Sequence, residues 1–304
     1  MRGQIATLAL GGGGARGIAH LGAIEELLKA GFSIERIVGV SIGGLVGALF
    51  AFDPDIARVQ QQASAFLNSP QFRRHQQHLF GTQFAAPAGG TIVSRYRRLA
   101  GSLRANRMLY RAVRHSSILP GELLEQVVNH LLPDADIAHA RIPLSVVAVD
   151  LHTGRPVVFD KGSLRLAVRA SASVPGIFPP VASEGRLLSD IGGFSDLTLG
   201  VARSYRPRLL VAVDVGADLK TLARVPSAVE ILLRMNDIGA ALFREHVTAK
   251  ADVVILPDVG HVEWFDFSSA GAMIAAGRSA TQLALSEIPP RQGWLERLFT
   301  RDPR

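Results

Sequence analysis

Apolar and polar positions over the first sixty residues follow a pattern typical of strand, helix, strand and helix. Ile5–Leu10 and Ile34–Val40 are short apolar runs that predict buried strands. Between them, Ala15–Ala30 has apolar residues at helical spacing and is followed by a glycine, and Ile42–Phe52 predicts a second helix. Because strands alternate with helices, we expect an α/β protein with a mostly parallel sheet.

One irregular stretch interrupts this pattern. Between Phe66 and Pro120 the periodicity is weak, so we interpret residues 66–120 as an insertion or lid over one end of the sheet, helical around Ser94–His115. After it, the pattern predicts four helices: Gly121–Leu132, Leu164–Ser173, Ser227–Thr248 and Ser268–Ser286. It also predicts the strands Leu144–Asp150, Val157–Phe159, Leu209–Asp214 and Asp252–Leu256, and a hairpin-like stretch over Pro180–Asp190. Since no repeat or linker is evident, a single domain over residues 1–304 is expected.

Composition narrows the class of protein. With 48% hydrophobic and 19% charged residues, the 304-residue chain is expected to fold around a large core. It has no cysteine, which excludes disulfides and cysteine nucleophiles. The uncharged apolar stretch Ile37–Phe52 is shorter than the ~18–20 residues that span a bilayer. We expect a cytoplasmic protein that can bind a membrane peripherally, and export without a cleavable signal stays open.

Charge is unevenly distributed along the chain. The net charge is +7, yet between Asp55 and Glu122 there is no acidic residue. A localised basic segment indicates an anionic partner, either a membrane or a nucleic acid. The arginines of this segment are Arg58, Arg73, Arg74, Arg95, Arg97, Arg98, Arg104, Arg107, Arg111 and Arg114.

Two glycine-rich segments carry the candidate chemistry. Gly11–Gly17 follows the first strand and offers a row of backbone N–H groups where a helix starts. Gly39-Val40-Ser41-Ile42-Gly43 follows the second strand and places a serine on a sharp strand-to-helix turn. An acyl-transfer enzyme needs both an oxyanion hole and an exposed nucleophile, so the two segments together favour that chemistry.

Gly12–Gly17 also satisfies the Gly-x-Gly-x-x-Gly pattern of dinucleotide-binding proteins. That function requires an acidic residue at the end of the second strand to bind a ribose. The second strand is instead followed by Ser41, and Glu35 lies too early in the chain to reach a ribose. The pattern therefore disfavours nucleotide binding.

A nucleophilic serine needs a base, and the residues leave two arrangements open. His261, in a predicted loop, suits a Ser-His-Asp triad better than His246, which lies in a helical run, or His20, which we interpret as a hydrogen-bonded helix residue. Asp190 precedes Gly192-Gly193, and a carboxylate held close to a serine can accept its proton directly. The alternatives are thus a triad with His261 and a dyad with Asp190.

With these residues in view, the chain resembles the bacterial patatin-like phospholipases, which are serine acyl hydrolases. Leu8–Gly22 is similar to the family's oxyanion-hole strand, loop and helix, and Gly39–Gly44 to its nucleophile elbow. Val149–Gly154 and Arg169–Pro180 match two further family segments, of which Arg169–Pro180 is the most specific. These segments keep the family's order along nearly the full chain.

The resemblance implies a single catalytic domain with a three-layer α/β/α fold and no cofactor or metal. Its substrate would be a phospholipid or another acyl-ester lipid. By analogy, Ser41 is the nucleophile and Asp190 its partner, and the oxyanion donors lie on Gly12, Gly13 and Gly14. The supporting positions are Arg16, Gly39, Gly43 and Gly192.

The chain departs from the family pattern after Asp190. Ile191 stands where the family usually has glycine, and Asp196 where it often has asparagine. A β-branched residue does not readily adopt positive φ, so we expect a reshaped turn. This departure leaves two alternatives to a phospholipase with a Ser-Asp dyad. One is a general carboxylesterase with His261 as base. The other is a catalytically weak member that binds an anionic membrane or nucleic acid.

The basic segment is expected to contact lipid. Arginines near an anionic bilayer gain roughly 1 kcal/mol each, and apolar side chains such as Leu99 and Leu103 lie between them. A nucleic-acid partner is not expected, because no recognition motif accompanies the arginines. The predicted membrane contacts are Arg95, Arg97, Arg98, Arg104, Arg107 and Arg111.

Overall fold

A computed structural model describes residues 3–70, 72, 117–191, 197–216, 219, 231, 235, 238, 239, 241, 242 and 251–287. The predicted helical part of the insertion, most of the predicted helix Ser227–Thr248, Gly192, Asp196, His246 and the predicted membrane contacts lie outside these residues. Predictions that concern them are not addressed by the structure.

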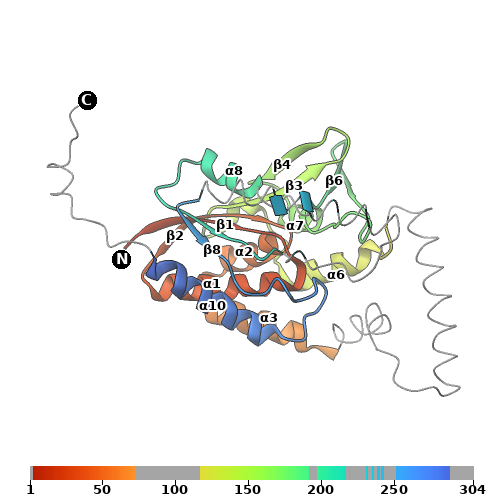
Figure 1. The fold of residues 1–304 in the computed structure, drawn as a ribbon. Coiled ribbons are helices and arrows are strands. Elements are labelled where there is room, and N and C mark those ends of the chain that lie inside the picture. Colours follow the sequence, from red (N-terminus) through yellow and green to blue (C-terminus); the bar gives the residue numbers. More distant parts are fainter. Residues whose placement is uncertain are drawn as a thin grey trace, which may run out of the picture.

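A mixed, mostly parallel sheet forms the centre of the molecule (Figure 1). Its strands follow the order β5-β6-β3-β2-β1-β7-β8, and β4 pairs with β3 beside this path. The pairs β3–β2, β2–β1, β1–β7 and β7–β8 are parallel, whereas the pairs of β3 with β4 and β6, and of β5 with β6, are antiparallel. The strands are β1 (Ile5–Leu10), β2 (Ser33–Val40), β3 (Leu144–Asp150), β4 (Arg155–Phe159), β5 (Val181–Ser183), β6 (Arg186–Ser189), β7 (Leu210–Val213) and β8 (Val253–Ile255).

Helices cover both faces of this sheet (Figure 1). Successive strand side chains point to opposite faces, so Leu8 and Leu10 enter the main core while Ala9 enters a smaller one. The main core lies against α1 (Ala19–Lys29), α2 (Ile42–Phe52), α3 (Ile56–Asn68), α6 (Gly121–Leu131), α7 (Leu164–Ser171) and α10 (Ala270–Ser286). The smaller core is closed by α8 (Leu197–Ser204). The predicted three-layer α/β/α fold is confirmed.

The structure differs from the predicted elements in four places. Helix α3 was not predicted, and Phe66–Asn68, assigned to the insertion, are its last residues. Helix α8 was not predicted either. The first predicted helix begins as a short 3-10 helix, Gly14–Ile18, before α1. A second 3-10 helix spans Ile137–His139.

Within the described part of the chain, every helix is too short or too polar to cross a membrane.

Candidate active site

Ser41 occupies a strained backbone conformation between β2 and α2. Its φ of 54° and ψ of −126° lie in a region that non-glycine residues rarely adopt. The flanking glycines are required by close packing. A Cβ at Gly39 would lie 2.5 Å from the Gly43 carbonyl oxygen, and a Cβ at Gly43 would overlap the Leu10 carbonyl. The sharp turn expected from the sequence is therefore present, with Ser41 at the helix start.

The glycine loop, Gly11–Gly14, follows β1 and is fixed at both ends. The Gly11 N–H donates to the Val213 carbonyl at 3.0 Å, and the Ala15 N–H donates to the Trp264 carbonyl at 2.6 Å. Between these anchors, the N–H groups of Gly12, Gly13 and Gly14 donate to no acceptor among the described residues. The loop thus presents consecutive N–H groups at the start of a helix, where the helix dipole favours negative charge.

Glycine is needed within this loop for two reasons. Gly14 has a φ of 60°, and a Cβ there would overlap the Trp264 carbonyl. A Cβ at Gly13 would lie 2.6 Å from the Val215 carbonyl oxygen. Any side chain would therefore push the loop away from the chain segments that anchor it.

Ser41 and Asp190 are held by the same short segment at the end of α7. The Ser41 N–H donates to the Ser171 hydroxyl at 2.8 Å, and that hydroxyl donates to the Val147 carbonyl at 2.6 Å. The Asp190 N–H donates to the Ser173 carbonyl at 2.9 Å. Both Ser41 and Asp190 are buried, with 7% and 3% of their surface exposed. The segment predicted to be the most family-specific thus fixes the backbone at both candidate residues.

The matching segment around Asp150 has a structural role. The Asp150 carboxylate accepts hydrogen bonds from the Thr153 hydroxyl and from the backbone N–H groups of His152 and Leu187. Burial raises the pKa of Asp150, but these hydrogen bonds outweigh burial and lower it. Because Leu187 lies on β6, Asp150 ties the β3–β4 turn to the strand that leads into Asp190.

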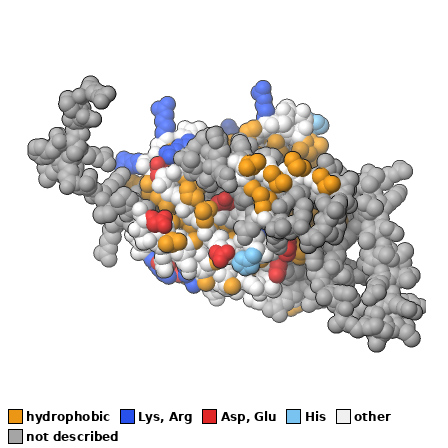
Figure 2. Space-filling view, in the orientation of Figure 1, with side chains coloured by type: hydrophobic (Ala, Val, Ile, Leu, Met, Phe, Trp, Pro, Cys, Tyr) orange, Lys and Arg blue, Asp and Glu red, His pale blue; other side chains and the backbone are white. Residues whose placement is uncertain are grey.

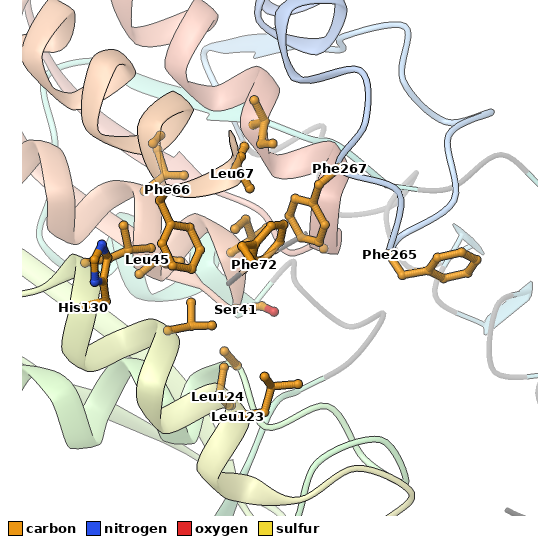
Figure 3. Close-up of a pocket in the computed structure, with 18 of the residues that line it drawn as sticks. Ser41, Leu45, Phe66, Leu67, Phe72, Leu123, Leu124, His130, Phe265 and Phe267 are labelled. Carbon is orange, nitrogen blue, oxygen red and sulfur yellow. The ribbon is translucent and has the colours of Figure 1, made fainter. Parts of the chain in front are cut away.

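Ser41 lines an apolar cavity of about 740 Å³ (Figure 3). This volume lies within the roughly 300–1,000 Å³ range of small-molecule sites. Its walls come from α1, α2, α3, α6, the segment after α7 and the loop after β8. The polar side chains of Gln126, Asn129 and His130 lie on α6 at exposed positions. In Figure 3 the serine hydroxyl lies among apolar side chains that include Leu45, Phe66, Leu67, Phe72, Leu124 and Phe267.

The histidines predicted as alternatives differ in environment. His261 has 67% of its side chain exposed, faces Asp258 with 3.6 Å between Nδ1 and Oδ1, and is not among the residues that line the Ser41 cavity. His20 is fully buried, and its Nε2 lies 2.8 Å from the Gly11 carbonyl oxygen. The prediction that His20 is a hydrogen-bonded helix residue is confirmed.

The other predicted residues have clear positions. Glu35 lies near the start of β2 and accepts a hydrogen bond from Thr7, far along the strand from Ser41. Arg16 donates to the Val262 carbonyl at 3.3 Å, beside the glycine loop. Ile191 is buried and is not among the residues with positive φ in the described chain. Ile191 therefore does not need the positive φ that would favour glycine, and the rest of the turn that was expected to be reshaped lies outside the described residues.

Charged side chains of both signs are spread over the described surface seen in Figure 2, and hydrophobic side chains gather over part of it. On this face, neither the acidic nor the basic side chains of the described residues gather into a single patch.

Sequence reasoning missed three contributors to the site. Ser171 and Ser173 were quoted only as part of a similar segment, and the Trp264 carbonyl was not considered. The available signal for Trp264 was an aromatic run, Trp264-Phe265-Asp266-Phe267, in a chain with 6% aromatic residues.

Comparison with known proteins identifies the family to which the chain is similar. The patatin-like phospholipase family matches residues 8–201, a span that contains Ser41, Asp190 and the glycine loop. An uncharacterized NTE family protein of Mycobacterium tuberculosis is 26% identical over 311 residues, covering 94% of this chain and 47% of that protein. Human patatin-like phospholipase domain-containing protein 6 is 28% identical over 269 residues, covering 86% of this chain and 16% of that protein.

A lysophospholipase nte1 of Aspergillus fumigatus is 29% identical over 215 residues, covering 71% of this chain and 12% of that protein. The chain spans less than half the length of these relatives. Among solved structures, VipD from Legionella pneumophila aligns with a TM-score of 0.45 at 16% identity, covering 93% of this chain and 66% of that chain. Because the family match extends over more than half of its residues, the chain belongs to the patatin-like phospholipase family, a family of serine ester hydrolases.

Proposed function

We propose that the protein is a lipid acyl hydrolase that cleaves carboxylic esters through an acyl-serine intermediate. The observation that carries this proposal is the position of Ser41, on a strained turn that opens into a large apolar cavity. The names of its relatives support phospholipids or lysophospholipids as the substrate class.

The proposed mechanism uses two side chains and the glycine loop. The Ser41 hydroxyl attacks the ester carbonyl while the Asp190 carboxylate accepts its proton. The negative charge on the carbonyl oxygen is stabilised by N–H groups of Gly12, Gly13 and Gly14, which have no acceptor among the described residues. The C–O bond of the ester then breaks, and the alcohol leaves with the proton from Asp190. Water hydrolyses the acyl-serine by the same steps.

We assign the cavity to the acyl chain. Its lining is almost entirely apolar, so it would bind a hydrocarbon chain and exclude water from the reacting carbonyl. Each buried methylene contributes about 0.8 kcal/mol, which corresponds to roughly a 4-fold change in an equilibrium constant. We therefore expect kcat/KM to rise by up to about 4-fold per methylene until the cavity is filled.

The direct test is hydrolysis of lipids and of p-nitrophenyl esters of increasing chain length. Ser41→Ala is expected to lose activity by at least ~10⁴-fold, and Leu45→Trp, which fills the cavity, to shift the preferred chain to shorter lengths. Leu283→Trp, at an exposed position on α10, is the matched control and is expected to keep the wild-type profile. Equal activity of wild type and Ser41→Ala would contradict the proposal.

The identity of the base is tested separately. Asp190→Asn keeps the size of the side chain but removes the carboxylate, and we expect kcat to fall by at least ~10³-fold. His261→Ala is expected to stay within 2-fold of wild type, because His261 is exposed and outside the cavity lining. The opposite result would favour the triad.

We further propose that the arginine-rich segment binds the surface of anionic membranes. Arg58 lies on α3 and pairs with Asp53, and the other arginines of the segment lie outside the described residues, so the support for this proposal is the sequence alone. Sedimentation with anionic and zwitterionic liposomes at increasing salt tests this proposal. Binding that does not depend on anionic lipid or on salt would contradict it.

A further inference from the structure

His20 is a buried imidazole that the proposed mechanism does not use. It lies in the first turn of α1, directly behind the glycine loop, and none of its surface is exposed. Its Nε2 lies 2.8 Å from the Gly11 carbonyl oxygen. Because a carbonyl oxygen can only accept a hydrogen bond, Nε2 must carry the proton and donate it.

This assignment leaves Nδ1 without a proton. Nδ1 is buried and has no partner among the described residues. Burial lowers the pKa of His20 to about 4, although the Gly11 carbonyl and the negative charge of Asp214 oppose this change. The ring is therefore neutral near pH 7, with one fixed donor and one unused acceptor.

The hydrogen bond from His20 to Gly11 holds a peptide group that belongs to the glycine loop. The carbonyl of Gly11 belongs to the same planar peptide unit as the N–H of Gly12. In a trans peptide the C=O and N–H bonds point in opposite directions, so an anchor on the Gly11 oxygen fixes the direction of the Gly12 N–H. The bond between the Gly11 N–H and Val213 fixes the preceding peptide.

We propose that His20 is a positioning residue: by holding the Gly11 carbonyl, it aims the Gly12 N–H at the developing oxyanion. This role rests on the proposed acyl-hydrolase function. It differs from that of a general base, since the His20 Nε2 proton is committed to Gly11 and the ring is enclosed beneath the loop. Donors fixed before the reaction stabilise the transition state more than the bound substrate, so the effect should appear in kcat.

Three substitutions of His20 test this role. His20→Gln can place an amide donor close to the position of Nε2, whereas the shorter His20→Asn cannot reach it and His20→Leu has no donor. Loss of one oxyanion donor typically reduces the rate by ~10²–10³-fold. We expect kcat to fall by about 10–100-fold in His20→Leu and His20→Asn with KM within 3-fold, and by less than about 5-fold in His20→Gln.

A trifluoromethyl ketone provides a second readout, because its adduct with Ser41 carries the oxyanion. We expect its inhibition constant to rise in His20→Leu by the same factor by which kcat falls, while the affinity for a free fatty acid is unchanged. Thr281→Val is the control for packing, since it removes a buried hydrogen bond between a side chain and the Gly277 carbonyl on α10. It is expected to lower stability without changing kcat.

The outcomes separate the two proposals. If wild type hydrolyses esters but His20→Leu keeps its kcat within 3-fold, or His20→Gln is as impaired as His20→Leu, the role of His20 is wrong. If wild type hydrolyses no ester, the proposed function fails. The crystal structures of His20→Gln and His20→Leu then still decide the positioning role, which an unchanged Gly11–Gly12 peptide in His20→Leu would overturn.

Discussion

At the scale of single residues, the site depends on where a methyl group fits and where it does not. Gly43 and Gly44 are neighbours in the first turn of α2, yet their surroundings differ. A Cβ at Gly43 would overlap the Leu10 carbonyl at the end of β1. A Cβ at Gly44 would meet the Val146 side chain at 3.3 Å, a contact that a small shift can accommodate. Of these two glycines, only Gly43 is required for Ser41 to lie close to the glycine loop.

We therefore expect Gly43→Ala and Gly44→Ala to behave differently. Gly43→Ala should reduce the free energy of unfolding by about 3 kcal/mol, because backbone atoms must separate. It should also reduce kcat by ~10²-fold, the typical cost of a misplacement near 1 Å. Gly44→Ala should stay within about 1 kcal/mol of wild type, since alanine favours the helix. Denaturant titration and ester hydrolysis measure both effects, and similar losses in both variants would contradict the argument.

At the scale of elements, α7 connects parts of the site that are distant in sequence. Its last residue, Ser171, bonds to Ser41, which is 130 residues away in the chain. The same hydroxyl donates to Val147 in β3, and Ser173 just beyond the helix accepts from Asp190. One end of α7 thus sets the spacing between β2, β3 and the segment after β6.

The two ends of α7 offer a matched pair of substitutions. Ser171→Ala leaves the Ser41 N–H and the Val147 carbonyl without their partner, so we expect a loss of about 2–4 kcal/mol in stability and at least a 10-fold lower kcat. Ser163→Ala removes the cap of the Leu166 N–H and should cost about 1 kcal/mol with kcat within 2-fold. The ratio of the two kcat values is the decisive measurement. A ratio near one would show that α7 does not support Ser41.

Local patterns explain which elements could be predicted. β1, β2 and α2 are strongly apolar, and glycines lie at the turns that follow both strands, so the existence of these elements and the turn at Ser41 followed from the sequence. Helix α3 escaped prediction because its sequence is rich in glutamine and Val59 is its only fully buried residue. Helix α8 is only eight residues long. The hydrogen bond between Ser41 and Ser171 could not be predicted, because it depends on strand order rather than on any local pattern.

At the scale of the whole molecule, two buried or paired groups couple stability to pH. Burial lowers the pKa of His20 to about 4 in the folded protein, below the ordinary histidine value of 6.5, so the unfolded chain binds more protons between these values. The free energy of unfolding should therefore fall as pH drops from about 6.5 to 4, by about 3 kcal/mol in total. Glu25 affects the free energy of unfolding at lower pH than His20 does. Burial opposes the ionisation of Glu25, but hydrogen bonds from Lys29, Gln60 and Arg278 lower its pKa to about 2.

The contribution of His20 to the pH dependence of stability can be measured by comparing wild type with His20→Gln. Denaturant titrations at pH 4, 5, 6 and 7 are expected to show that wild type loses stability faster than His20→Gln as pH falls from about 6.5, because glutamine does not titrate. Below about pH 4.5 both proteins should also lose the stabilisation from the ion pairs of Glu25 with Lys29 and Arg278. Parallel pH profiles for the two proteins would contradict the proposed protonation state.

The hydrogen bond between Ala15 and Trp264 has a consequence for how the substrate affects catalysis. Trp264, Phe265 and Phe267 line the cavity, and the Trp264 carbonyl also anchors the glycine loop. A chain that packs against these aromatic side chains therefore presses on the same segment that keeps the loop in place. Contacts made far from the ester bond can in this way act on the carbonyl itself. If the cavity binds the acyl chain as we propose, longer acyl chains should raise the turnover rate as well as the affinity, and the cavity would then help to set the speed of the reaction.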